Sequence, residues 1–238
     1  MKDERLIVAL DVRTMAEVRA LVEQLGETVS YYKVGMELFY AVGRTALDYL
    51  HDEGKHIFLD LKLHDIPNTV AEGLCSLLKL RANMMNLHAS GGYMMMKTAA
   101  ERVREKAEKS GVPVPKLIAV TVPTSISVKE WSEMGNRDSV RERVVRLAEL
   151  AKRAGLDGVV ASPMEAAAIH EACGGDFLIV TPGVRPAGVA ADDQSRIATP
   201  AAAIQNGATH LVVGRPIRSA SDPRAAAEAI IREMEGAI

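Results

Sequence analysis

Ile57-Phe-Leu-Asp-Leu-Lys-Leu-His-Asp-Ile-Pro-Asn-Thr69 has the pattern of a strand, a loop and the start of a helix. Ile57, Leu59, Leu61 and Leu63 point to one face of the strand, and Phe58, Asp60 and Lys62 point to the other. The two charged groups therefore share one face. His64 and Asp65 fall in the loop, Pro67 ends the strand, and Asn68 or Thr69 can cap the helix. Ions removed from water need partners, so this face predicts a site where charged groups act on a ligand. The alternative is an ion pair that has no function in catalysis or binding.

The same strand-to-helix order recurs along the chain and predicts the fold. Amphipathic segments, such as Met94–Lys109 before Gly111 and Arg137–Arg153 before Gly155, follow short apolar runs. A regular alternation of this kind requires a parallel sheet, and eight units favour a closed (β/α)8 TIM barrel over an open doubly wound sheet. We expect one α/β domain over residues 1–238, with strands at 6–10, 31–34, 56–61, 84–88, 117–121, 158–161, 177–181 and 210–213.

Composition limits the classes of partner. The formal charge of −2 gives no general electrostatic reason to bind nucleic acid or an anionic membrane. Cys75 and Cys173 lie outside any metal-ligand or CxxC spacing and are expected to be helix thiols. The apolar run Leu6–Leu10 is too short for a signal peptide or a membrane span. The sequence therefore predicts a soluble protein of the reducing cytoplasm.

Polar side chains follow nearly every expected strand. In a barrel, the carboxyl ends of all strands meet at one face, so residues far apart in sequence converge there. His88 is expected either to support this cluster by a hydrogen bond or to pack in the core. The residues at these positions are Asp11, Lys33, Asp60 with Lys62, His88, Thr121 with Thr124, Ser162, Arg185 and Arg215.

The last two strand ends predict a phosphate site. Thr181-Pro-Gly-Val-Arg185 and Val212-Val-Gly-Arg-Pro-Ile217 each place a glycine and an arginine where a barrel commonly binds phosphate. The alternative is a tight turn at Gly214 with a surface Arg215. The irregular stretch Pro182–Ser195 is expected to be a loop at the catalytic mouth that can act as a lid.

Other motifs carry little functional signal. The sequence has no HExxH, GxGxxG or P-loop, and no carboxylate cluster with metal-site spacing, so no metal ligand is predicted. Trp131, in the segment 125–135, is as consistent with packing as with ligand contact.

The chain resembles the orotidine 5′-phosphate decarboxylase family along essentially its whole length. The resemblance rests on Ala9-Leu-Asp11, Tyr32-Lys-Val-Gly-Met-Glu-Leu-Phe39, Phe58-Leu-Asp-Leu-Lys-Leu-His-Asp-Ile-Pro67, Thr181-Pro-Gly-Val-Arg185 and Val213-Gly-Arg-Pro-Ile217. The Asp-x-Lys-x-x-Asp core alone is less specific, because it resembles sugar-phosphate enzymes on the same barrel.

The resemblance implies a reaction and a site. It implies decarboxylation of orotidine 5′-monophosphate to UMP and carbon dioxide, the last step of de novo pyrimidine nucleotide synthesis, by a homodimer that uses no cofactor. Lys62 is then similar to the acid that protonates C6, with Asp60 beside the departing carboxylate. By the same resemblance, Asp65 and Thr69 reach the neighbouring subunit's site, where Asp65 completes the charge array with Lys33 and Thr69 contacts the ribose.

The remaining contacts to substrate are carried over in the same way. Asp11 and Lys33 resemble the ribose-hydroxyl contacts, and Thr124 resembles the contact to the pyrimidine edge. The residues that resemble the family's phosphate contacts are Arg185, Gln194, Gly214 and Arg215, with Gln194 bridging phosphate and base.

Three rival functions stay open at this point. The nearest is a Mg²⁺-dependent sugar-phosphate decarboxylase or synthase on the same barrel, which EDTA would inhibit. An aldolase that uses Lys62 as a Schiff-base nucleophile would be trapped by borohydride. A non-catalytic barrel would bind nucleotide without turnover.

Overall fold

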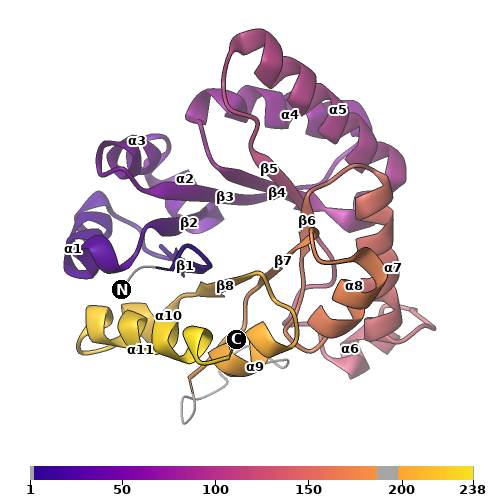
Figure 1. The fold of residues 1–238 in the computed structure, drawn as a ribbon. Helices are drawn as coiled ribbons and strands as arrows, with labels where there is room; N and C mark the ends of the chain where they lie inside the picture. The colour runs from indigo at the N-terminus through magenta and orange to yellow at the C-terminus, as the bar shows by residue number, and fades with distance from the viewer. Residues whose placement is uncertain (1–2, 187–197, 238) are drawn as a thin grey trace.

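Eight parallel strands close into a barrel in a computed structural model that describes residues 3–186 and 198–237. Each strand pairs with its neighbour in sequence, and β1 pairs with β8, so the sheet closes on itself (Figure 1). This confirms the (β/α)8 TIM barrel. The strands are β1 (Leu6–Ala9), β2 (Tyr31–Gly35), β3 (His56–Leu63), β4 (Met84–His88), β5 (Lys116–Val120), β6 (Gly158–Val160), β7 (Leu178–Thr181) and β8 (His210–Val213).

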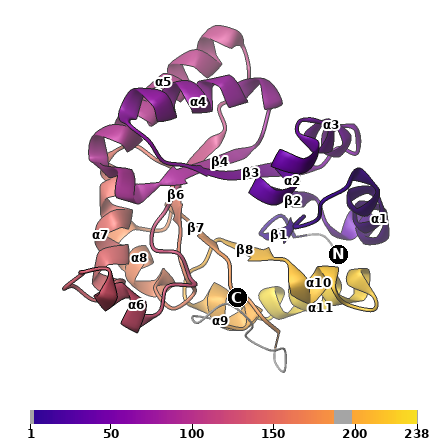
Figure 2. The same cartoon turned by 180° about the vertical axis from the view of Figure 1, so that it is seen from behind.

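Helices surround this barrel on the outside (Figures 1 and 2). The last helix packs beside the first, with Arg224 Nε donating to the Gln24 carbonyl oxygen at 3.0 Å. No helix in the described part of the chain has both the length and the apolar character of a membrane span. The α-helices are α1 (Met15–Leu25), α2 (Met36–Val42), α3 (Thr45–Asp52), α4 (Pro67–Leu77), α5 (Gly92–Ser110), α6 (Val128–Glu133), α7 (Val140–Arg153), α8 (Ala166–Cys173), α9 (Pro200–Gln205), α10 (Arg215–Arg218) and α11 (Pro223–Glu235), and short 3₁₀ turns are η1 (Gly26–Thr28), η2 (Leu78–Leu80) and η3 (Ala89–Gly91).

The two faces of β3 contribute to two separate cores. Ile57 and Leu59 are buried in the layer between sheet and helices, whereas Phe58 belongs to a smaller cluster inside the barrel. The alternation predicted for this strand therefore holds, and it directs Asp60 and Lys62 inward, where both line a cavity at the barrel mouth.

The starts of α4 and α7 differ from the sequence prediction, and α5 begins two residues earlier than Met94, at Gly92. Asn68 and Thr69 do not cap α4: Ile66 is the N-cap residue, without a side-chain hydrogen bond, and Pro67 occupies the first turn. Proline is favoured there because its missing N–H would be unpaired anyway. The helix expected from Arg137 begins at Val140, because Ser139 and Glu142 form a capping box at its start.

A glycine between two strands gives a stability prediction. A Cβ added at Gly158 would collide with Cβ, Cα and the carbonyl oxygen of Leu178 on β7, and two of these atoms are backbone that cannot move alone. We expect Gly158→Ala to lower the free energy of unfolding by about 1–3 kcal/mol, as overpacking does. Urea denaturation measures this change in the free energy of unfolding. Gly175→Ala is the matched control, because its Cβ would meet only His170 at 3.7 Å, and an equal loss in both variants would contradict the prediction.

Candidate active site

A cavity of about 370 Å³ lies at the carboxyl end of the barrel. Side chains from β2, β3 and β4 form one wall, and the segment after β5 forms another. The charged members are Lys33, Asp60 and Lys62, which sequence analysis predicted to converge. The other lining residues are Phe58, His88, Val120, Val122, Pro123, Thr124, Ser125, Val160, Ala161, Pro182 and Val212.

The charged side chains form an alternating array. Lys62 Nζ lies 2.7 Å from Asp60 Oδ1, and Lys33 Nζ lies 3.3 Å from Asp60 Oδ2. Lys33 Nζ also donates to Asp11 Oδ1 at 3.0 Å. Asp60 is only 6% exposed, so its carboxylate is held between two ammonium groups with little access to water.

Burial and charge oppose each other in this array. Burial disfavours the ionised form of Asp60, but Lys33 and Lys62 outweigh it, and the pKa of Asp60 lies below its usual value. Burial also favours loss of the Lys33 proton, and there the charges of Asp60 and Asp11 outweigh it, so the pKa of Lys33 is raised. The neighbouring charges therefore keep Asp60 and Lys33 ionised.

The backbone at Lys62 is unusual. Its φ of 53° is left-handed, which costs a residue with a side chain about 1–2 kcal/mol, and the β3–β4 register shifts between Leu59 and Leu63. Asn86 on β4 contacts this point twice: its Oδ1 accepts the Lys62 backbone N–H at 2.8 Å, and its Nδ2 donates to Asp60 Oδ1 at 2.6 Å. Sequence analysis missed Asn86. The signal for it was a lone amide within the apolar strand 84–88.

Two glycines make room for the array. A Cβ at Gly35 would lie 2.9 Å from Lys33 Nζ, and one at Gly214 would lie 3.4 Å from Asp11 Oδ2. Gly214 follows β8, so the carboxylate after β1 lies against the predicted phosphate loop. Asp11 therefore connects the charge array to the loop that follows β8.

The two predicted phosphate-binding arginines are not among the residues that line the cavity, although Pro182 and Val212 from the same two segments are. Arg185 is 5% exposed, and its backbone N–H donates to the Ala198 carbonyl oxygen at 3.0 Å. Arg215 opens α10, with Gly214 as the N-cap residue. Gln194 and most of the loop predicted as a lid lie outside the described residues.

Asp65 and Thr69 lie apart from the cavity of their own chain. Both are exposed, and neither lines the cavity. Asp65 Oδ1 accepts the backbone N–H of Ile66 at 2.6 Å. Ile66 itself is 66% exposed, so an apolar side chain and a carboxylate project from the same turn.

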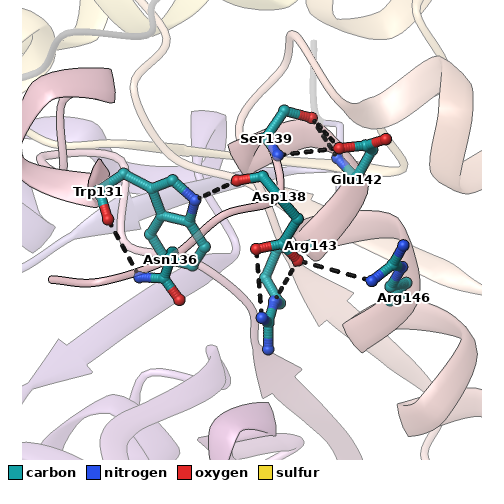
Figure 3. Close-up of polar contacts among 7 residues, drawn as sticks. All are labelled: Trp131, Asn136, Asp138, Ser139, Glu142, Arg143 and Arg146. Atoms are coloured by element: carbon teal, nitrogen blue, oxygen red, sulfur yellow. Dashed lines mark hydrogen bonds and ion pairs between the residues drawn. The ribbon is translucent and has the colours of Figure 1, made fainter.

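Polar contacts around Trp131 and Asp138 hold the segment between β5 and α7 (Figure 3). Trp131 Nε1 donates to the Asp138 carbonyl oxygen at 2.7 Å, and the Asp138 carboxylate accepts from Arg143 Nε at 2.8 Å and Nη2 at 3.2 Å. Trp131 is buried and belongs to the outer core. It serves to pack this segment against α7, while Thr124 and Ser125 line the cavity.

The supporting hydrogen bond predicted for His88 stays a prediction, and the residue belongs to neither hydrophobic core. It is half-buried at the end of β4, lines the cavity, and its ring lies 5.4 Å from that of His64. Burial, with the charges of His64 and Lys62, lowers the pKa of His88. Among the described residues, no group of three or more His, Cys, Asp or Glu side chains is placed to hold a metal ion.

Comparison with known proteins identifies the family. The model of the orotidine 5′-phosphate decarboxylase / HUMPS family matches residues 4–230. The chain belongs to this family. It is 50% identical to the orotidine 5′-phosphate decarboxylase of Moorella thermoacetica over 98% of this chain and 92% of that protein, and 48% identical to that of Trichlorobacter lovleyi over 97% and 95%.

Solved structures agree with this family. The chain is similar to the crystal structure of orotidine 5′-phosphate decarboxylase from Lactobacillus acidophilus, with a TM-score of 0.85 and 44% identity over 98% of this chain and 99% of that one. It is also similar to an uncharacterized conserved protein from Geobacillus kaustophilus, with a TM-score of 0.83 and 37% identity over 96% and 99%. The orotidine 5′-phosphate decarboxylase family therefore accounts for the fold and nearly all of the chain.

The array predicts a pH dependence of stability. The unfolded pKa of Asp60 is near 3.8 and the folded pKa is lower, so its contribution is complete above pH 3.8 and is lost as pH falls through the folded value. We expect Asp60→Asn to cost about 3–5 kcal/mol at pH 7, because a buried ion-pair partner is removed. The gap between wild type and variant should narrow on acidification, as measured by denaturation at several pH values. Asp52→Asn on the exposed end of α3 is the control, and a pH-independent gap for Asp60→Asn would refute the linkage.

Proposed function

We propose that this chain decarboxylates orotidine 5′-monophosphate to UMP and carbon dioxide, the last step of de novo pyrimidine nucleotide synthesis. The observation that carries the proposal is the Lys33–Asp60–Lys62 array in the wall of a cavity of about 370 Å³. Membership of the family and relatives near 50% identity named for this activity support it. No observation favours the Mg²⁺-dependent sugar-phosphate alternative.

Lys62 is the proposed acid. Loss of carbon dioxide leaves an electron pair at C6 in the plane of the pyrimidine ring, where the π system cannot delocalise it. A fixed ammonium group stabilises this charge in a water-poor cavity and then delivers a proton to C6. Asp60, 2.7 Å from Lys62 Nζ, fixes that ammonium and would repel the substrate carboxylate before it leaves.

The rest of the substrate is held by groups around the cavity. We assign Asp11 and Lys33 to the ribose hydroxyls, since their ion pair lies at the cavity edge, and Thr124 to the pyrimidine edge. Arg185, Gln194, Gly214 and Arg215 are the proposed phosphate contacts. Binding energy from the remote phosphate can then orient the ring for reaction.

We further propose a homodimer that shares residues between sites. Asp65 and Thr69 are exposed and lie outside their own cavity, which is the placement expected of residues that serve a partner. In this arrangement Asp65 adds a carboxylate to the partner's array beside Lys33, and Thr69 contacts the ribose. The cytoplasm as the location and a single domain over residues 1–238 stay predictions.

The direct test is an assay for the reaction. Purified protein with orotidine 5′-monophosphate in EDTA should show the ultraviolet change of carboxylate loss. Lys62→Ala should still bind UMP but lose at least about 10⁴-fold in kcat, because it removes both the proton donor and the charge that stabilises the carbanion. Absence of turnover by the wild type in EDTA, with activity restored by Mg²⁺, would favour the sugar-phosphate alternative.

The phosphate role of Arg215 is tested separately. We expect Arg215→Ala to lower kcat/KM by about 30-fold or more, because truncating one partner of a charge-assisted pair costs about 2 kcal/mol or more. Arg232→Ala on the exposed face of α11 is the matched control and should retain normal kcat/KM. Near-normal kcat/KM in Arg215→Ala would remove this residue from the phosphate site.

Mixed dimers test the shared site. Lys62→Ala and Asp65→Ala chains should each be inactive alone, and a hybrid of the two has one site with both native residues if Asp65 acts on its partner. Mixing and refolding equal amounts should restore up to about a quarter of wild-type activity, since half of the dimers are hybrids with one intact site each. No recovery, with hybrid dimers verified by mass, would place Asp65 in its own chain's site.

A further inference from the structure

Asn86 occupies a position that the proposed reaction does not yet explain. It lies in the middle of β4, is 1% exposed, and pairs in register with Ile118 of β5. Its side chain points to β3, where it contacts two residues of the array at once. A buried amide in a strand of apolar residues is costly unless both ends are paired, and here both are.

The orientation of this amide is fixed by its partners. The Lys62 backbone N–H can only donate, so it selects the carbonyl oxygen of Asn86. The Asp60 carboxylate can only accept, so it selects the amide nitrogen. A flipped amide would place oxygen against oxygen and donor against donor, so the side chain has one stable orientation.

The two contacts act on different properties of the site. The bond to Lys62 N–H lies where the regular pairing of β3 and β4 is interrupted, and it supports the left-handed backbone that directs this lysine. The bond to Asp60 Oδ1 reaches the same oxygen that accepts from Lys62 Nζ. Asn86 therefore contacts both the backbone from which the Lys62 side chain extends and the carboxylate that binds its ammonium group.

We propose that Asn86 is a positioning residue for the decarboxylation, one that holds the Lys62 ammonium and the Asp60 carboxylate in their reactive geometry. The proposal rests on the proposed function for its kinetic consequences. It differs from a purely structural role because the residue acts on the position of the acid and not only on the stability of the barrel.

Asn83, next to the same pair of strands, offers a control. Asn83, just before β4, also accepts a backbone N–H of β3 through its side-chain oxygen, from Ile57 at 2.8 Å. That bond lies at the opposite end of β3 from the array. Asn83→Leu therefore removes the same kind of hydrogen bond, from a β3 backbone N–H to an asparagine side chain, without touching Asp60 or Lys62.

The first experiment compares Asn86→Leu with Asn83→Leu. Leucine is close to asparagine in shape but makes neither bond. We expect Asn86→Leu to lower kcat by about 100-fold, as small misplacements of catalytic groups do, while its Kd for UMP changes less than about threefold. Asn83→Leu should keep its kcat. An Asn86→Leu enzyme with kcat within about threefold of wild type, or an equal loss in both variants, would overturn the proposal.

A second variant gives a signature that a structural role would not produce. Asn86→Asp places a second carboxyl within hydrogen-bond distance of Asp60, so the pair retains a proton to higher pH than an isolated carboxyl. While protonated, the introduced group can donate to Asp60 and accept from Lys62 N–H, as the amide does. We expect kcat of Asn86→Asp to rise toward wild type as pH falls from about 8 to about 5.

The other charged or titratable groups facing this site are present in both proteins. They are Asp11 after β1, Lys33 on β2, Asp60 and Lys62 on β3, and His88 on β4, whereas β5 presents the uncharged Ile118. The ratio of variant to wild-type kcat at each pH therefore isolates the introduced carboxyl. A ratio that does not change with pH would overturn the proposal, even where Asn86→Leu fails to fold.

A ligand-free measurement separates this proposal from the proposed function. The ¹³C chemical shifts of Lys62 report whether its backbone is left-handed, without any substrate. Loss of that conformation in Asn86→Leu, with retention in Asn83→Leu, supports the positioning role even if the wild type proves inactive on orotidine 5′-monophosphate. Unchanged Lys62 shifts in Asn86→Leu would contradict the role of Asn86 whatever the substrate is.

Discussion

The shared carboxylate of Asp60 is the interaction on which the rest of the site depends. Its two oxygens contact Lys62 and Lys33, and it is almost completely buried. A buried ion stripped of one partner is strongly destabilising, whereas a fully paired one is tolerated. The protein therefore has to supply both ammonium groups and the Asn86 amide together, and it does so from three adjacent strands.

The closed barrel is what makes this assembly possible. Lys33 and Asp60 come from neighbouring strands, and the regular β2–β3 register places Gly35 opposite Asp60, so a residue without a side chain lies where Lys33 Nζ approaches. The closure of β8 onto β1 brings Gly214 beside Asp11 in the same way. Glycines at the ends of β2 and β8 thus leave the space in which Asp11, Lys33, Asp60 and Lys62 pack together at the mouth of the barrel.

Much of the fold followed from local patterns, because strands and helices of a barrel have short, repeated signals. The alternation in 57–63 predicted the inward direction of Asp60 and Lys62, and the structure has them on that face. The start of α7 was misplaced because its capping box is set by a side chain at Ser139, and the two polar residues before it, Arg137 and Asp138, fit a helix equally well. Hydrophobic periodicity alone does not distinguish the polar residues before a helix from those in its first turn.

Features that depend on pairing between strands were not visible in the sequence. Asn86 gains its meaning only through the register shift between β3 and β4, and the left-handed backbone of Lys62 arises from the same shift. The proposed role of Asp65 likewise depends on a second chain, which a single sequence does not describe. Gln194 lies outside the described residues. Local sequence thus located the charges, while their exact geometry depends on contacts between distant residues.

The charge balance of the array links structure to the proposed chemistry. Within one chain, the ammonium groups of Lys33 and Lys62 are matched by the carboxylates of Asp11 and Asp60, so the ligand-free array is neutral. A carboxylate from a partner's Asp65 would make it negative, and the substrate's own carboxylate would then enter an unfavourable field beside Asp60. In the proposed reaction, departure of carbon dioxide would remove that repulsion and leave the new charge at C6 next to Lys62. The same buried ions that disfavour the bound acid would then favour the carbanion that replaces it.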